Sequence, residues 1–362
     1  MRRICLIGNN AFGKPVFDGQ RIKVRTYLNV LKKEGFDVDL IDLDKPFFRL
    51  FKIFRAIKKG LIKDDTIILI SSDRGERLLV PYINRLNKKY KKRFIFSQIG
   101  TSFLYRHIKN LTNAQQIEFF NGNNFFGQRP EKKVQKQLRR INVILPETKL
   151  IEECFSKFYG LTNCIAITNF RDVVVDFVEK QPSDFVRLVY ISRLTKRKGI
   201  FDLIDVVNLV NGLKNNRVLL DIYGTKYFDK SENTTFENLL SERIKYKGEI
   251  KPENVIATLR EYDLLCFPTL CEGEGTPGCV IESLISGTPV LSSSFTQSQE
   301  LLKNGFDSYI YQFGDTNDLK NKLIEYIDNK EKMKMNKNAY ESGKVFTYQF
   351  NRTLFLKIIC GD

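Results

Sequence analysis

The residues between Cys266 and Val290 have the types and the order that a sugar-binding loop needs. A buried strand is predicted to end near Phe267, and a loop with Glu272, Glu274 and several glycines follows before a helix begins at about Cys279. The N-terminus of a helix attracts anions such as phosphate. The two carboxylates in this loop would repel a phosphate, however, because they have the same sign of charge. A carboxylate instead accepts hydrogen bonds from neighbouring hydroxyls. The stretch predicts either a site for a sugar or ribose, or a carboxylate that caps a tight loop.

A second stretch, Tyr190–Ile200, places cations directly after a predicted strand. Arg193 follows the strand, and Lys198 precedes Gly199 at the start of the next helix. Two cations in such a loop can neutralise a diphosphate. An ordinary solvated basic loop is the alternative, and only the first stretch argues against it.

Short β-branched runs alternate with helical patterns along the whole chain, which predicts parallel sheets covered by helices. We expect two facing doubly wound, Rossmann-like domains at 1–170 and 171–345, and a helix at 346–362 that returns to the first domain. Such sheets bind ligands beyond the carboxyl ends of their strands. The strands are expected at Arg3–Gly8, Asp37–Ile41, Thr66–Ser71, Arg93–Gln98, Asn142–Leu145, Arg187–Ser192, Val218–Tyr223, Asp263–Phe267, Thr288–Ser292 and Asp307–Tyr311.

Together the two stretches resemble the retaining glycosyltransferases of family 4, which have the GT-B architecture. Glu274 and Glu282, with Pro277 and Gly278 between them, match the paired-glutamate motif of that family. Ser192–Gly199 matches its Gly-Arg-Leu-x-x-x-Lys-Gly pattern, with serine in place of the first glycine. The resemblance is continuous from about residue 187 to residue 330, and its segments occur in the expected order.

The resemblance implies a role for each matching residue. Arg193 and Lys198 would stabilise the departing diphosphate, and Glu274 would hold hydroxyls of the donor sugar, which makes these three the catalytic candidates. Glu282 would bind the ribose. A divalent metal and a separate cofactor are not expected, because cations and a helix terminus replace them. The other donor-binding candidates in this half are Pro277, Gly278, Gly224, Thr225, Glu249 and Ile250.

The first half matches less closely. A loop at 8–13 and the following Gly19 and Gln20 resemble the glycine loop of the family, and Gly19 and Lys23 would approach the donor phosphates. An ordinary turn between a strand and a helix is the alternative. Many relatives have a histidine near the strand end that precedes Gly100, where this chain has Ser-Gln-Ile-Gly. His107 lies several residues later and is expected to be a surface residue.

The chain has 362 residues and a formal net charge of +17, and the excess lies in one half. Residues 1–170 contain 33 lysines and arginines against 15 acidic residues, whereas residues 171–362 contain 26 against 27. Such asymmetry indicates an acidic partner for the first half. The seven cysteines include no Cys-x-x-Cys pair, so we expect reduced thiols in the cytoplasm and no metal site.

Residues 45–63 predict how the basic half meets that partner. The segment has seven basic and no acidic residues, and its phenylalanines recur at helical spacing. Such a helix can lie on an anionic membrane, here the inner face of the plasma membrane, or it can pack its aromatic face on the sheet. We expect an anionic membrane surface as a partner, together with a lipid-linked or glycan acceptor. The membrane-facing candidates are Phe47, Arg49, Phe51, Lys52, Phe54, Arg55, Lys58 and Lys59.

The sequence therefore predicts a metal-independent, retaining glycosyltransferase that uses a nucleotide-diphosphate sugar, with UDP favoured as the nucleotide, in the synthesis of surface polysaccharides. A nucleotide-sugar epimerase or a phosphorylase of the same fold is the nearer alternative. A basic nucleic-acid-binding protein is the distant one, since no recognised nucleic-acid module is present. We expect no nucleic acid as a partner.

Overall fold

The structure, a computed structural model, describes residues 2–13, 18–44, 50–181, 183–215, 217–271 and 273–361. It divides into two compact units. The first comprises the chain up to Asp172, together with Gly273–Thr276 and the segment from Tyr348 onward. The second comprises the rest. The first division thus falls after Asp172, compared with an expected boundary after residue 170.

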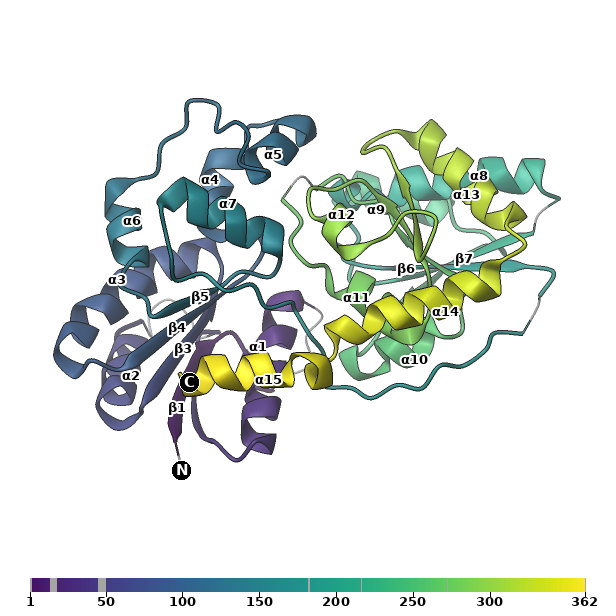
Figure 1. Cartoon of the computed structure of the whole chain (residues 1–362). Coiled ribbons are helices and arrows are strands. Elements are labelled where there is room, and N and C mark those ends of the chain that lie inside the picture. Colours follow the sequence, from purple (N-terminus) through teal and green to yellow (C-terminus); the bar gives the residue numbers. More distant parts are fainter. Residues whose placement is uncertain are drawn as a thin grey trace. The chain divides into compact units, whose positions relative to one another are not determined.

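The first unit is built on a parallel sheet with the strand order β2-β1-β3-β4-β5 (Figure 1). Nearly every residue of its central strands is buried. Strands covered on both faces need apolar side chains on both, which explains the continuous apolar runs. The strands are β1 (Arg3–Gly8), β2 (Asp37–Asp42), β3 (Thr66–Ser71), β4 (Arg93–Gln98) and β5 (Val143–Leu145).

Helices cover both faces of this sheet. One apolar core includes side chains of α2, α3, α5 and α7, and the other includes side chains of α1 and α15. The helices are α1 (Gly19–Lys33), α2 (Leu50–Lys63), α3 (Asp73–Tyr90), α4 (Tyr105–Ile108), α5 (Asn113–Phe120), α6 (Lys132–Leu138), α7 (Lys149–Tyr159) and α15 (Tyr348–Cys360).

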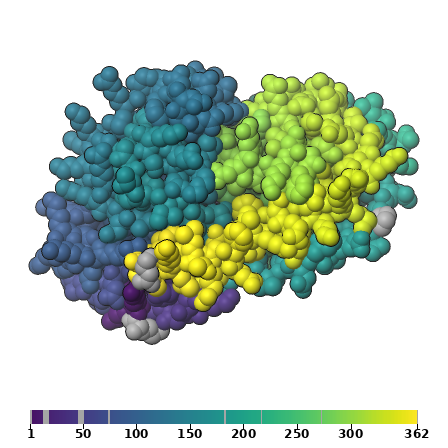
Figure 2. Space-filling view, in the orientation of Figure 1, coloured from purple at the N-terminus to yellow at the C-terminus, as the bar shows by residue number. Residues whose placement is uncertain are grey.

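The last helix, α15, completes the second of these cores. Phe355, Ile358 and Ile359 are buried there, and the ring of Phe355 lies edge-on to that of Tyr27 at 5.1 Å. The guanidinium of Arg93 donates to the carbonyl of Ile358 at 2.9 and 3.1 Å. In the space-filling view the yellow atoms of this helix lie beside the purple atoms of the N-terminal strand (Figure 2).

The second unit has a six-stranded parallel sheet with the order β11-β10-β9-β6-β7-β8. Figure 1 labels two of its neighbouring strands, β6 and β7. The chain enters at β6, builds outward through β7 and β8, and then builds in the other direction from β9. The strand order therefore reverses between β6 and β9, which are neighbours. The strands are β6 (Val186–Ile191), β7 (Val218–Tyr223), β8 (Ile244–Gly248), β9 (Leu264–Phe267), β10 (Val290–Ser293) and β11 (Ser308–Tyr311).

This second sheet also has a core on each face. Side chains of α8, α9 and α13 contribute to one, and side chains of α10, α11 and α14 contribute to the other. The helices are α8 (Ile200–Leu213), α9 (Lys230–Asn238), α10 (Val255–Leu259), α11 (Gly278–Ser286), α12 (Ser298–Leu301), α13 (Thr316–Asp328) and α14 (Lys332–Gly343).

The expected fold class, two α/β domains with parallel sheets, is confirmed. All ten expected strands are present, with bounds that differ by two residues at most. The expected strands omit β8, whose residues alternate between buried and exposed. Its exposed positions hold Lys245 and Lys247, so the segment lacks the apolar run that marks the interior strands.

Candidate functional site

The basic loop after β6 has a backbone that only glycine permits. Gly199 has φ of +70°, and a Cβ atom on it would lie 1.8 Å from the carbonyl oxygen of Pro268. The loop after β9 is joined to it again by a hydrogen bond from the Leu270 N–H to the Arg197 carbonyl, at 2.9 Å. The loops that follow the adjacent strands β6 and β9 are thus packed against each other.

The two cations of this loop that the sequence predicts to be catalytic have different surroundings. Arg193 is exposed, whereas Lys198 is partly buried with its ammonium 5.7 Å from the centroid of the Phe267 ring. The hydroxyl of Tyr190, a buried residue of β6, donates to the carbonyls of Arg193 at 3.2 Å and Lys198 at 3.4 Å. Tyr190 is a positioning residue that the sequence analysis missed. The sequence feature that could have indicated it is a tyrosine, with its polar hydroxyl, near the end of an otherwise apolar strand.

The loops after β7 and β8 join the same edge. Gly224 has φ of +142°, and a Cβ atom there would lie 1.8 Å from the carbonyl oxygen of Ser192. The hydroxyl of Thr225 donates to the Glu249 carboxylate at 2.5 Å. Ile250 is partly buried against the apolar core. The structure therefore brings the predicted residues Gly224, Thr225 and Glu249 together with the Arg193 loop.

Helix α11 begins at the same edge of the second sheet. Its first residue is Gly278, and Pro277 before it has no side-chain acceptor to cap the helix. Backbone N–H groups of this first turn therefore suit an anion. Glu282 lies one turn further along the helix and is only 6% exposed. Its carboxylate, which the sequence motif predicts to bind a ribose, is therefore a mostly enclosed group of this helix.

Glu274 lies in Gly273–Thr276, the segment that is counted with the first unit. A Cβ atom on Gly275 would lie 2.6 Å from the Cα atom of Gly100, so the two backbones need glycine to approach this closely. The Thr276 N–H donates to Glu147 at 3.3 Å, and the Asn169 side chain donates to the Thr276 carbonyl at 3.3 Å. These contacts hold the segment that carries Glu274.

Glu147 is the second residue that the sequence analysis missed. One of its carboxylate oxygens accepts from the Lys23 ammonium at 2.9 Å, and the other accepts from the Gly100 N–H at 3.3 Å. The Lys23 ammonium also donates to the carbonyl of Gln98 at 2.7 Å. Both side chains of the ion pair are at least 97% buried. Lys23, expected at the donor phosphates, is therefore part of an internal ion pair, and we leave it out of the proposed donor contacts.

The loop after β1 also differs from a phosphate-binding loop. Its N–H groups at Asn10, Ala11 and Phe12 donate to the carboxylates of Asp42 and Asp44 at 2.6–3.0 Å. These donors are the ones that a phosphate would need, and the carboxylates would repel it. The loop is therefore an acidic one.

Hydrogen bonds keep one of these carboxylates charged. Burial alone would raise the pKa of Asp44, but hydrogen bonds from Arg21, Asn9 and the Ala11 N–H outweigh burial and lower it to about 2. Gln20 donates to Asn9 in the same network, at 2.8 Å. Gly19 is the first residue of α1 and is exposed.

Helix α2 separates the membrane-facing candidates into two groups. Lys52, Arg55, Lys58 and Lys59 are exposed, and Phe51 is 77% exposed beside them. Phe54 instead packs on the core, with its ring centroid 4.5 Å from that of Tyr82, so its expected orientation toward a membrane was wrong. Its place on the inner side follows from Ile53 and Ile57, which are buried on that side of the helix. Phe47 and Arg49 lie outside the described residues.

The single histidine is not a surface residue. His107 is 8% exposed and packs against the ring of Phe158 at 4.7 Å, with its Nδ1 atom 3.1 Å from the Gln128 side chain. The sequence expectation was wrong because the neighbouring cations point outward while the imidazole joins an aromatic cluster of the first unit.

The buried Lys180 of the second unit should make the free energy of unfolding depend on pH. Its ammonium donates to the Thr288 hydroxyl at 2.9 Å, and burial lowers its pKa to about 7, although the Asp263 charge opposes this. The unfolded chain, with the ordinary value of 10.5, therefore binds more protons between pH 7 and 10.5. The free energy of unfolding attributable to Lys180 should rise with pH across this window, by up to about 1.4 kcal/mol per unit.

Urea denaturation at pH 6, 7, 8, 9 and 10 checks this prediction in the unmodified chain and in Lys180→Met. The difference in unfolding free energy between the two should change between pH 7 and 10 and stay constant below pH 7. A difference that does not vary with pH would show that Lys180 has an ordinary pKa.

Part of the chain is similar to known glycosyltransferases. Residues 175–342 match the family described as "Glycosyl transferases group 1". An uncharacterized glycosyltransferase of Methanocaldococcus jannaschii is 26% identical over 202 residues, which are 55% of this chain and 54% of that protein. The chain thus spans about half the length of this curated relative.

Two solved structures share the fold. The crystal structure of Anabaena HepE in complex with UDP and glucose has a TM-score of 0.71 and 13% identity, with 100% of both chains covered. The apo form of the lipopolysaccharide outer core galactosyltransferase WaaB has a TM-score of 0.67 and 15% identity, with 99% of both chains covered. At this identity the likeness shows a common fold, with the parallel sheets described above in each unit.

Proposed function

We propose that the chain, whose residues 175–342 match the family described as "Glycosyl transferases group 1" and whose fold is that of GT-B enzymes, transfers a sugar from a nucleotide-diphosphate donor to a glycan or lipid-linked acceptor. The donor in this proposal is a UDP-sugar, and the anomeric configuration is retained. Surface polysaccharide synthesis is the proposed pathway. HepE with UDP and glucose, and WaaB as a lipopolysaccharide galactosyltransferase, support these choices by analogy of fold.

The observation that carries the proposal is the reversal of strand order in the second sheet. In open parallel sheets, ligands bind outside the carboxyl ends of the strands where the order reverses. Here that point lies between β6 and β9. The loop after β6 carries Arg193 and Lys198, and the loop after β9 leads into α11 with Glu282. This arrangement supports a nucleotide site formed by the residues that the motifs single out.

Each group has a distinct role in this proposal. Arg193, Lys198 and the N-terminus of α11 neutralise the diphosphate and stabilise its charge as the bond to the anomeric carbon breaks. Glu282 accepts hydrogen bonds from the ribose, and Glu274 holds hydroxyls of the transferred sugar. Glu249 and Ile250 lie next to the base. Because the two cations and the helix N-terminus stabilise the negative charge of the diphosphate, the proposed reaction needs no divalent metal.

A panel of nucleotide sugars tests the proposal on the unmodified chain. Thermal stabilisation identifies the donor, and release of the nucleotide with and without acceptors then measures hydrolysis and transfer. The Glu274→Ala variant should bind the donor but turn it over slowly. An epimerase would instead yield an altered sugar with no acceptor present. Unchanged turnover in Glu274→Ala would contradict the proposed site.

Helix α2 suggests how the acceptor is reached, and we propose that its exposed cations lie on an anionic membrane surface. None of the helices in the described residues is both long enough and apolar enough to cross a bilayer. Lys52 and Arg55 flank the exposed Phe51, so an aromatic ring and two cations share one surface. Each such cation contributes about 1 kcal/mol near an anionic surface.

The Lys52→Gln/Arg55→Gln variant should therefore bind anionic vesicles roughly thirtyfold more weakly, by about 2 kcal/mol. Co-sedimentation with phosphatidylglycerol-containing and purely phosphatidylcholine vesicles measures this. The Lys132→Gln/Lys133→Gln variant is the matched control, since these exposed lysines of α6 remove the same charge from the same unit. Equal loss in both variants, or equal binding to both vesicle types, would exclude a role for α2.

A further inference from the structure

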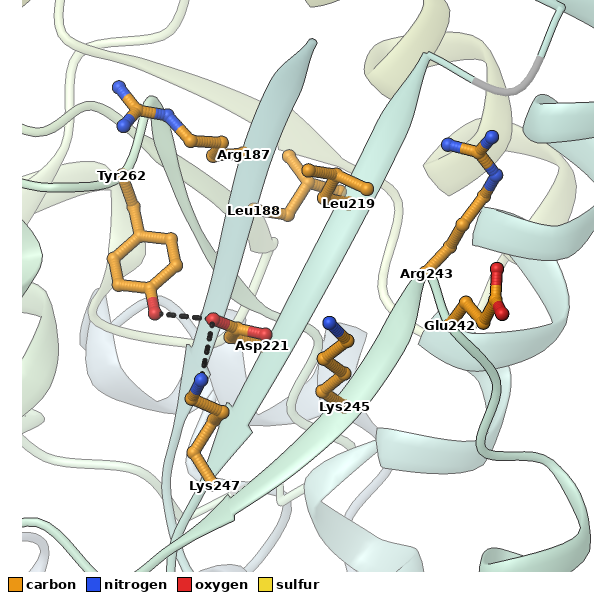
Figure 3. A pocket seen from close by; sticks show the side chains of 9 residues that line it. All are labelled: Arg187, Leu188, Leu219, Asp221, Glu242, Arg243, Lys245, Lys247 and Tyr262. Atoms are coloured by element: carbon orange, nitrogen blue, oxygen red, sulfur yellow. Dashed lines mark hydrogen bonds and ion pairs between the residues drawn. The ribbon is translucent and has the colours of Figure 1, made fainter.

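The second unit has a pocket of about 150 Å³ on the face of its sheet, lined by none of the proposed donor-binding residues (Figure 3). Arg187 and Leu219 contribute from the amino-terminal halves of β6 and β7. Lys245 and Lys247 contribute from the edge strand β8, and Tyr262 lies just before β9. Since a strand rises about 3.3 Å per residue, Arg187 lies roughly 13 Å along β6 from Ile191, after which the Arg193 loop begins.

The pocket exists because one face of β7 and β8 is only partly covered. Along β7, buried residues alternate with partly exposed ones, and Leu219 and Asp221 belong to the exposed set. Phe236 of α9 packs in the core on the opposite face, with Leu220 and Ile222. On the pocket face, the helix that follows β8 is α10, which has only five residues, and β7 and β8 stay partly exposed beside it.

The polar groups in this pocket do not neutralise one another. Its lining includes four cationic side chains and two anionic ones. Asp221 accepts from the Tyr262 hydroxyl at 2.7 Å, and the Lys247 ammonium lies 3.8 Å from the same carboxylate oxygen (Figure 3). Asp221 thus interacts with both the Tyr262 hydroxyl and the Lys247 ammonium. The cationic side chains of the lining therefore outnumber the carboxylates that could pair with them.

Two further cations of the lining, Arg187 and Lys245, have N–H donors without a hydrogen-bond partner among the described residues. The Arg187 guanidinium lies 3.6 Å from Asp263, but its Nε atom is buried and has no hydrogen-bond partner among the described residues. Lys245 stands between Asp221 and Arg243 in Figure 3, and its ammonium makes no ion pair or hydrogen bond with the described part of the chain. A buried donor without a partner costs free energy unless a ligand or water satisfies it.

Lysines on an edge strand also prevent sheets from pairing, so Lys245 and Lys247 alone would need no ligand. That function does not explain the other members of the pocket. Arg187 belongs to β6, in the interior of the sheet, and the Tyr262 hydroxyl is held between Asp221 and the Tyr223 hydroxyl at 3.1 Å. Cations from two strands and a fixed phenol around one cavity are the arrangement of an anion site.

We propose that this pocket binds a phosphate group, either as inorganic phosphate or as part of a compact phosphomonoester. With Asp263 beside Arg187 counted as well, the pocket and its surroundings keep one excess positive charge, and a phosphate group accepts hydrogen bonds from ammonium and guanidinium groups. The volume is several times the roughly 30 Å³ share of one water molecule, which admits such a group. None of the pocket residues is a proposed donor contact, although Lys247 lies two residues before Glu249 in the chain. The use of UDP to block the donor site in the test below rests on the proposed function.

Equilibrium dialysis with radiolabelled inorganic phosphate tests the proposal. The full chain is saturated with UDP so that the donor site is blocked. We expect one phosphate bound per chain under these conditions, and at least tenfold weaker binding in the Lys245→Ser/Lys247→Ser variant. The Lys230→Ser/Lys337→Ser variant is the matched control, because it removes two exposed lysines from the same unit and should bind phosphate as the unmodified chain does.

Two outcomes would overturn the proposal: UDP abolishes all phosphate binding, or the pocket variant and the control variant bind equally. Thermal unfolding of both variants shows that the loss does not come from unfolding. Competition by glucose 1-phosphate then distinguishes the two sources. Displacement at a concentration below that of free phosphate identifies a phosphomonoester, and displacement only at a higher concentration identifies inorganic phosphate.

Discussion

Replacing Arg193 with alanine is expected to lower the rate of sugar transfer by roughly 10²- to 10³-fold, the loss typical of one charge-stabilising donor. Arg193 follows β6 at the reversal of strand order, its side chain is exposed, and its backbone carbonyl accepts a hydrogen bond from the Tyr190 hydroxyl. Because the diphosphate gains charge as it leaves, the loss should fall mainly on kcat. Steady-state kinetics with the donor found in the nucleotide-sugar panel measures the change.

The matched control for this variant is Lys196→Ala. Lys196 is an exposed cation of the same loop, in the short helix Lys196–Lys198, and the sequence motif assigns it no role. It should retain kcat within about a factor of three, since surface changes have small effects. Equal losses in both variants would show that only the net charge of the loop matters, which contradicts a specific contact from Arg193.

The second large effect is expected on stability. Replacing Glu147 with leucine leaves the Lys23 ammonium buried without its counter-charge, which costs about 3–5 kcal/mol. The Gly100 and Thr276 N–H groups lose their acceptor as well. Native-state hydrogen exchange of the strands β1 to β5 measures the effect, because it reports the first unit separately where a two-domain chain need not unfold in one step.

The double variant Lys23→Met/Glu147→Leu should recover most of this stability, since two apolar side chains replace a buried ion pair with little net cost. Glu118→Leu, at an exposed position of α5, is the matched control and should leave exchange in the sheet unchanged. If the double variant is as unstable as the sum of the two single variants, the two charges do not interact and the buried pair has been misassigned.

The fold could be predicted from the sequence to the extent that patterns are local. Interior strands are continuous apolar runs, so β3 and β4 are found at their observed bounds. Strand β8 is different, because it lies at the sheet edge and alternates lysines with buried residues. Its pattern is too short and too polar to be distinguished from a loop without knowledge of its neighbour β7.

The residues of the candidate site also differ in whether a local sequence pattern reveals them. Arg193 and Glu282 belong to local motifs with fixed spacing, so residue type and position are enough to select them. The Lys23–Glu147 pair joins residues 124 positions apart, and nothing near either residue indicates the other. The acidic environment of the first loop was missed for the same reason, since Asp42 and Asp44 reach it from the end of β2.

The place of α15 has a consequence for biosynthesis. The chain leaves the first unit after Asp172 and supplies Phe355, Ile358 and Ile359 to its core only after the second unit has been translated. The second unit is contiguous apart from a four-residue excursion, so it can form while that core is still open. On the ribosome, an incomplete first unit with an exposed apolar face must therefore persist until α15 emerges, and this interval is when the nascent chain most needs a chaperone.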